Sequence, residues 1–154
     1  YRIMQTSQLK EIQSLIESMA YEVTFTPRGE TSIVDMLSVL LDNEDDFDTK
    51  EQKIIITGYP DEDELDGSFF MQFFSEYSFT VQDKDLLNLL NMINQVNLLL
   101  PLGAFYLGEE NSKLYFKYVL AYPKESSITA AFLNDVLDMA IYAIDEFQEG
   151  FENL

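Results

Sequence analysis

Carboxylates are the only abundant side chains in this chain that could carry out chemistry. The sequence has 28 Asp and Glu but no His and no Cys, which removes thiol chemistry, histidine bases and the softer metal ligands. Paired carboxylates can hydrolyse glycosides without histidine, yet no spacing marks a pair, because the acids concentrate in predicted loops and on one side of the last predicted helix. A carboxylate-based hydrolase is therefore the last of three functional hypotheses, behind the protein-binding module and the small-molecule sensor given below. We expect no catalytic site and no cofactor.

Two acidic stretches, residues 42–48 and 61–67, resemble calcium-binding loops. Such a loop needs a Gly at its sharp turn, but Phe47 stands there in the first stretch. In the second, Leu65 occupies a ligand position and Gly67 comes one residue late. We therefore predict solvated acidic loops and no metal site. Other motifs are missing too: the glycines are isolated, so no loop that cradles phosphate is present, and no Ser-x-x-Lys or Gly-x-Ser-x-Gly nucleophile motif occurs.

The charge balance limits the classes of partner. Nine Lys and Arg against 28 acids give a formal charge of −19, and the cations are scattered singly. Binding to nucleic acid or to an anionic membrane depends on clustered cations, so both are poor partners. A basic protein partner, loosely held divalent cations or simple solubility remains open.

Length and composition predict one folded domain spanning residues 1–154. The chain is 47% hydrophobic and 14% aromatic, which is far from the composition of disordered chains. No apolar run approaches the roughly 20 residues of a membrane span, and no secretory signal is visible. With no Cys, which agrees with a reducing compartment, these features predict a cytoplasmic protein.

The hydrophobic spacing predicts a mixture of helices and strands, the α+β class. Three- and four-residue spacing predicts amphipathic helices, and alternation predicts half-buried strands. The run Phe69 to Phe74 is apolar at both alternating positions except Gln72, which predicts a central strand covered on both sides. The predicted helices cover residues 6–20, 83–97 and 128–147, with Thr129 as an N-cap; the predicted strands cover 21–25, 36–41, 53–58, 69–74 with an extension at 78–81, 105–107 and 114–120.

The last predicted helix is apolar around more than half of its circumference, which one face of a sheet cannot cover. We favour the interpretation that the N-terminal helix lies beside it. The alternative is an exposed apolar flank for a second copy or another protein. The residues predicted for such a surface are Leu133, Leu137 and Ile141 here, with Leu87 and Leu98 on the preceding helix.

The helix that begins at Asp83 carries an Asn every three residues near its end. A helical wheel puts Leu86, Leu90 and four other apolar residues on its buried arc, with Asn94 and Asn97 within or beside that arc. Buried amides need hydrogen-bond partners. We predict structural roles for Asn94, Asn97 and the strand residue Gln72, with Asn97 capping a backbone carbonyl or turning the chain where the helix ends.

Residues 85–122 resemble the YbjN-like family of bacterial proteins. In that family a helix ending in Ile-Asn-x-x-Asn, here Ile93 to Asn97, leads through a glycine, here Gly103, into a short strand and then a longer one. The aromatic run around Gln72 is similar to the cyanobacterial branch of this group. The resemblance implies a fold like that of type III secretion chaperones, an antiparallel sheet of about five strands with helices packed on it, often dimeric and without catalytic activity.

These observations predict a non-enzymatic module that binds protein, in the manner of a chaperone or adaptor and with a regulatory role. Its partner would be another protein or a second copy of the chain, held through apolar surface on the last two helices. The alternative is a small-molecule sensor with an aromatic-lined pocket between the strand Phe69 to Phe74 and the helices, which predicts a sizeable internal cavity.

Overall fold

The computed structural model describes residues 2–41, 52–58, 65–108 and 112–154, with side chains from residue 8 onward. Six strands form one antiparallel sheet in the order β1-β2-β3-β4-β6-β5. The predicted α+β class is confirmed, with six strands rather than about five. In chain order the elements are α1 (Arg2–Ser18), β1 (Glu22–Thr26), β2 (Met36–Leu40), β3 (Lys53–Gly58), β4 (Ser68–Thr80), the 3-10 turn η2 (Asp83–Asp85), α2 (Leu86–Leu99), β5 (Ala104–Leu107), β6 (Lys113–Pro123) and α3 (Ala130–Glu152).

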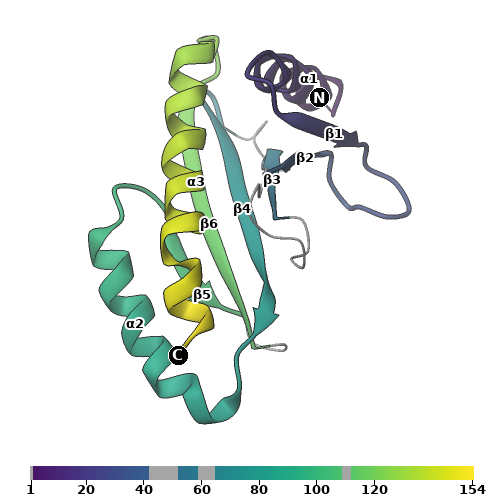
Figure 1. Ribbon diagram of the computed structural model, residues 1–154. Helices are drawn as coiled ribbons and strands as arrows, with labels where there is room; N and C mark the ends of the chain where they lie inside the picture. The colour runs from purple at the N-terminus through teal and green to yellow at the C-terminus, as the bar shows by residue number, and fades with distance from the viewer. Residues whose placement is uncertain (1, 42–51, 59–64, 109–111) are drawn as a thin grey trace.

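The three helices form a layer on one face of the sheet (Figure 1). The long helix α3 runs along β4 and β6 in the middle, α1 lies beside its N-terminal half over β1 to β3, and α2 lies beside its C-terminal half next to β5. The favoured interpretation of the wide apolar arc on α3 therefore agrees with the structure, which adds α2 as a second flanking helix.

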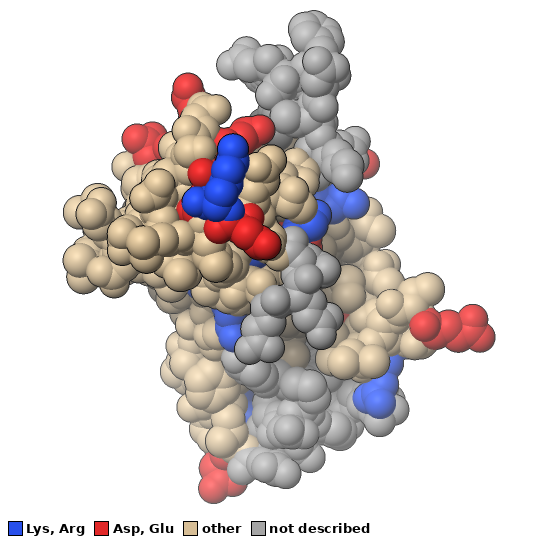
Figure 2. Space-filling model, turned by 90° about the horizontal axis from the view of Figure 1, so that it is seen from below, with Lys and Arg blue, Asp and Glu red and all other residues tan. Residues whose placement is uncertain are grey.

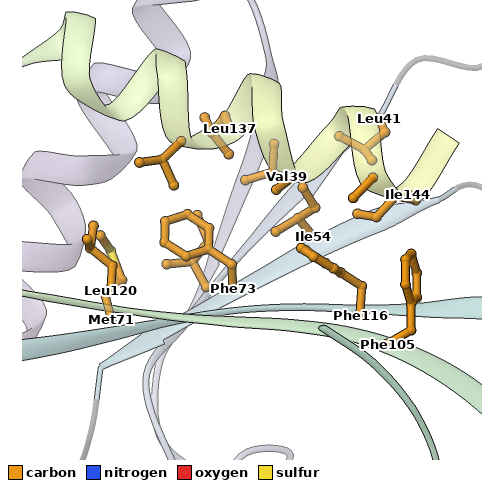
Figure 3. Close-up of a cluster of buried hydrophobic side chains, with 14 of the residues drawn as sticks. Val39, Leu41, Ile54, Met71, Phe73, Phe105, Phe116, Leu120, Leu137 and Ile144 are labelled. Atoms are coloured by element: carbon orange, nitrogen blue, oxygen red, sulfur yellow. The ribbon is translucent and has the colours of Figure 1, made fainter. Parts of the chain in front are cut away.

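Strict alternation along β4 builds the core. Its odd-numbered residues from Phe69 to Tyr77 are buried, whereas even-numbered residues such as Phe70 and Phe74 are half-buried on the opposite face. Figure 3 shows Met71 and Phe73 pointing from the sheet toward Leu137 on α3. Within the described residues the helices cover only this inner face, whereas we predicted cover on both faces of the aromatic run.

The long strand β4 also differs from the prediction at its C-terminal end. We predicted a strand over residues 69–74 with a separate extension at 78–81, but β4 is one strand from Ser68 to Thr80. Its pairing with β6 shifts between Glu76 and Thr80, where four steps along β4 match two steps along β6. An irregularity of this kind increases the local twist without ending the strand.

Local signals place the limits of the last helix. Thr129 is the N-cap of α3, and its hydroxyl accepts a hydrogen bond from the backbone N–H of Phe132 at 3.1 Å. This satisfies one of the free donors of the first helical turn, as the sequence predicted. The helix extends to Glu152, beyond the predicted end at Phe147. No helix in the described part of the chain combines the length and the hydropathy needed to cross a membrane.

Candidate protein-binding surface

The helix α2 presents one apolar side to the core and another to solvent. Leu89, Ile93 and Val96 are buried, at 0%, 8% and 5% exposure. On the opposite side Leu87 is 71% exposed and Leu98 is 80% exposed. An amphipathic surface helix normally places charged or polar residues on that side, so these two leucines require an explanation.

The α2 outer face contains no charge. We define this face as Leu87, Leu90, Asn91, Asn94 and Leu98, all of which are exposed. The whole 14-residue helix lacks Asp, Glu, Lys and Arg, in a chain whose formal charge is −19. Seen from below, the part of the surface that projects farthest to the left, the side on which α2 lies in Figure 1, is tan, without red or blue side chains (Figure 2).

A double hydrogen bond from Asn97 fixes the rotation of α2. The Asn97 side-chain Nδ2 donates to the carbonyl of Phe105 at 2.9 Å, and its Oδ1 accepts from the Phe105 backbone N–H at 2.8 Å. Phe105 lies in β5, the edge strand of the sheet, so this amide satisfies backbone groups that no strand binds. Leu98 lies about 100° further around the helix and is 80% exposed.

A close contact with α3 holds the same helix from a second side. A Cβ atom on Gly150 would lie only 2.6 Å from Cε of Met92, so the missing side chain makes room for Met92. The α2 outer face therefore belongs to a helix that is attached both to the edge of the sheet and to α3.

The structure places two of the predicted surface residues in the core, which corrects our prediction for them. Leu133 and Leu137 are both 0% exposed, and Ile141 is half-buried against the core. The physical reason is that α3 packs on the sheet, where Met71 and Phe73 point toward Leu137, and that α1 and α2 flank it and cover the rest of its wide apolar arc. Leu87 and Leu98 remain, and they are among the most exposed apolar residues described.

Sequence reasoning misplaced other residues on α2. The wheel put Leu86 and Leu90 on the buried arc, but they are 37% and 45% exposed. The wheel had Asn91 facing away from that arc, and Asn91 is exposed. The absence of charge over 14 consecutive residues was the available signal, because it marks the helix as unlike the rest of this acidic chain.

The three residues predicted to have structural polar roles lie in different settings. Asn97 binds both backbone groups of Phe105, the carbonyl among them, as described above. Asn94 is exposed, so its amide can be hydrated and needs no protein partner. Gln72 is half-buried in β4, paired in register with Thr57 and Val119.

Aromatic side chains fill the space where the sensor alternative requires a cavity. Phe69 and Phe73 are both 1% exposed. Their rings lie 5.0 Å from Tyr122 and 6.1 Å from Tyr118, measured between ring centroids. A shallow hollow of about 520 Å³ lies instead at the start of β3, and it is lined by Lys53, Ile55, Phe74, Glu76, Tyr77, Ser78 and Lys113.

The titratable groups with shifted pKa values are mostly tyrosines and make no acid–base pair. Burial, and then the nearby charge of Asp145, raises the pKa of Tyr77 far above its usual value, so its hydroxyl stays protonated and donates to the carbonyl of Ile144. Partial burial raises the pKa of Asp145 itself. Such shifts follow from burial and a neighbouring charge, and they do not by themselves mark a catalytic group.

No metal site is found in the described part of the chain, where no three His, Cys, Asp or Glu side chains come together. The calcium-like stretch 42–48 and residues 61–64 of the second stretch lie outside the described residues. The described surface thus offers apolar contact on α2 as its main unexplained feature.

Comparison with known proteins assigns a family. No curated protein matches this sequence. Among solved structures, the crystal structure of YbjN from E. coli, "a putative transcription regulator", is similar with 12% identity and a TM-score of 0.48, covering 88% of this chain and 84% of that one. Residues 37–153 match the family YbjN, described as "Putative bacterial sensory transduction regulator". That match covers well over half of the sequence, and the chain therefore belongs to the YbjN family.

Proposed function

We propose that this protein is a non-enzymatic regulatory module that binds another protein chain through the α2 outer face. The observation that carries the proposal is the exposure of Leu87 and Leu98 on a helix without charge. Full burial of one leucine side chain is worth roughly 1.5–3 kcal/mol. Leaving several in water on a rigid helix forgoes that gain until a partner covers them.

The electrostatics of the chain support apolar contact at this face. A surface that carries −19 repels other acidic proteins, but the uncharged α2 outer face lets a partner approach without placing carboxylates in a buried interface. Unpaired charges are costly at the centre of an interface. The α2 outer face is thus the part of the described surface best suited to lie at such a centre.

The family description supports a regulatory role in general terms. Within the proposal, the role is chaperone- or adaptor-like, because the α2 outer face holds a partner and no acid–base pair was found among the described groups. We place it in the cytoplasm because a chain without cysteine suits a reducing compartment.

A single introduced cysteine tests the proposal, because the chain has no cysteine of its own. Leu98→Cys would carry a benzophenone label, and the labelled protein would be irradiated in an extract of the source cells. Discrete crosslinked protein species are expected, to be identified by mass spectrometry. The control is Ile33→Cys, since Ile33 is 86% exposed and lies away from α2. Equal crosslinking at both positions, or none at position 98, would overturn the proposal.

A further inference from the structure

Three lysines gather on the outer face of the sheet, the face that no described helix covers (Figure 1). Lys53 lies on β3, and Lys113 and Lys117 lie on β6, where each alternates with buried core residues of its own strand. Alternate residues of a strand point to opposite faces of a sheet, so the three lysine side chains share the outer face. The sequence scatters its nine cations singly, and the pairing of distant strands brings these three to one face.

The charges on this face do not cancel. Glu76 is the one acidic residue of β3, β4 and β6, and its Oε1 lies 3.4 Å from Nζ of Lys113. Lys53 and Lys117 form no ion pair within the described part of the chain. A protein with a formal charge of −19 therefore presents a local excess of positive charge on the outer face of its sheet.

Lys53 and Lys113 both line the hollow of about 520 Å³ at the start of β3. Ile55 and Phe74 also line it; they are paired in register across β3 and β4, and both are half-buried. The hollow thus combines an apolar wall with two cations. Sites for small molecules have this mixed lining and occupy roughly 300–1,000 Å³, so the hollow has the size and the chemistry of a ligand site.

Buried hydrogen bonds hold the start of β3 in place beside the hollow. Gln52 and Ser75 are 5% and 3% exposed. Nε2 of Gln52 donates to Oγ of Ser75 at 2.6 Å and to the carbonyl of Glu76 at 3.0 Å. Oγ of Ser75 in turn donates to the carbonyl of Lys53 at 2.6 Å. The backbone that carries Lys53 is thus ordered before any ligand binds, which lowers the entropic cost of binding.

The irregular pairing of β4 with β6 lies at the same place. The register shifts between Glu76 and Thr80, and Glu76, Tyr77 and Ser78 from this segment line the hollow. Irregularities of this kind redirect side chains and are over-represented beside functional sites. The hollow therefore lies where the regular sheet is interrupted.

We propose that this hollow binds a small organic anion with a planar apolar body, of the class of the aromatic carboxylates. Nζ of Lys53 holds the anionic group, because Lys53 has no ion pair among the described residues, and Lys113 is the second cation beside it. The planar body lies against Ile55 and the ring of Phe74. The lysines thereby select the charge of the ligand, and the apolar wall selects its shape.

This inference is independent of the proposed function. The hollow opens on the outer face of the sheet, whereas α2 belongs to the helix layer on the opposite face (Figure 1). The two sites can therefore be occupied separately. Loss of the crosslinks from Leu98→Cys would leave the anion site standing, and failure of the anion site would leave the protein-binding surface standing.

Two probes of the same shape test the choice of charge. Naphthalene-2-carboxylate and the neutral naphthalene-2-methanol would each be titrated into isotope-labelled protein at neutral pH, and binding would be followed by backbone amide shifts in NMR spectra. We expect saturable shifts with the carboxylate that concentrate at residues 53–55 and 74–78, and weaker binding of the alcohol. Equal affinity for both probes, or no saturable shift at these residues, would overturn the proposal.

A pair of lysine variants tests the role of Lys53. Lys53→Gln should weaken the carboxylate about fivefold, which is the upper end of what one solvent-exposed ion pair contributes, and should leave the alcohol unaffected. Lys84→Gln removes the same charge from an exposed position in η2, outside the hollow, and should bind the carboxylate like the parent. The amide spectra of both variants also show whether the fold is retained. An unchanged affinity in Lys53→Gln, or an equal loss in both variants, would overturn the assignment.

Discussion

Asn97 and Phe105 are joined by two hydrogen bonds, from the Asn97 side chain to both backbone groups of Phe105. The Asn97 side chain thereby binds two backbone groups at the edge of the sheet that a further strand would otherwise bind, and it attaches α2 to the sheet. Phe105 is 1% exposed, so water cannot easily replace these bonds.

Replacing Asn97 by Ala should destabilise the protein strongly. Each buried backbone group left without a partner costs roughly 1–3 kcal/mol, and two groups are affected. Urea melts would measure the loss of unfolding free energy. Asn88→Ala removes the same kind of side chain from an exposed position of the same helix and should change the free energy of unfolding little. A similar loss in both variants would contradict the role given to Asn97.

Replacing Gly103 by Ala should also destabilise the protein. Gly103 has a φ of +72°, and an added Cβ would lie 2.5 Å from the ring of Phe116 and 3.0 Å from the carbonyl of Lys117. The left-handed backbone alone costs about 1–2 kcal/mol for a residue with a side chain. Thermal melts would test this, with Gly67→Ala as control, because no atom lies within 4 Å of a Cβ added there.

The two faces of β4 should respond differently to the same truncation. Phe73 is 1% exposed, so Phe73→Ala should cost about 3–5 kcal/mol. Phe74 is half-buried on the other face, and Phe74→Ala should cost clearly less. Urea melts of both variants would show an unchanged midpoint for Phe73→Ala if its ring did not belong to the core.

Asp145 should make stability depend on pH. Because partial burial raises its pKa in the folded state, the folded protein binds the proton more tightly than the unfolded chain. This tighter proton binding contributes to the free energy of unfolding, and the contribution is complete below the ordinary aspartate pKa of about 3.9. It is lost as the pH rises through the folded-state pKa of Asp145.

The Asp145→Asn variant should therefore be more stable than the parent at neutral pH, on the order of a few tenths of a kcal/mol for so exposed a group. That advantage should vanish near pH ~3.5. Urea melts at the two pH values would measure it. Asp135→Asn, on the same helix and exposed like Asp145, controls for the removal of one charge, and an equal gain there would contradict the effect of burial on the Asp145 pKa.

Several local features could be predicted because neighbouring residues determine them. Thr129 caps α3 through a backbone donor three residues away, and the alternation from Phe69 to Tyr77 separates the two faces of β4. The absence of His and Cys limited the available chemistry without any structure. The missing charge on α2 was equally visible in the sequence.

Only the tertiary structure decided which apolar residues remain exposed. A helical wheel gives the spacing of Leu86, Leu90 and Leu98 but not the neighbours that cover them, and burial depends on those neighbours. Leu133 and Leu137 are buried because α3 packs on the sheet and because α1 and α2, distant in sequence, flank it. Leu98 is exposed because the opposite side of α2, with Leu89, Ile93 and Val96, is the side that packs into the core. The sequence by itself determined the amphipathic elements, and contacts between distant segments determined which face of each element meets water.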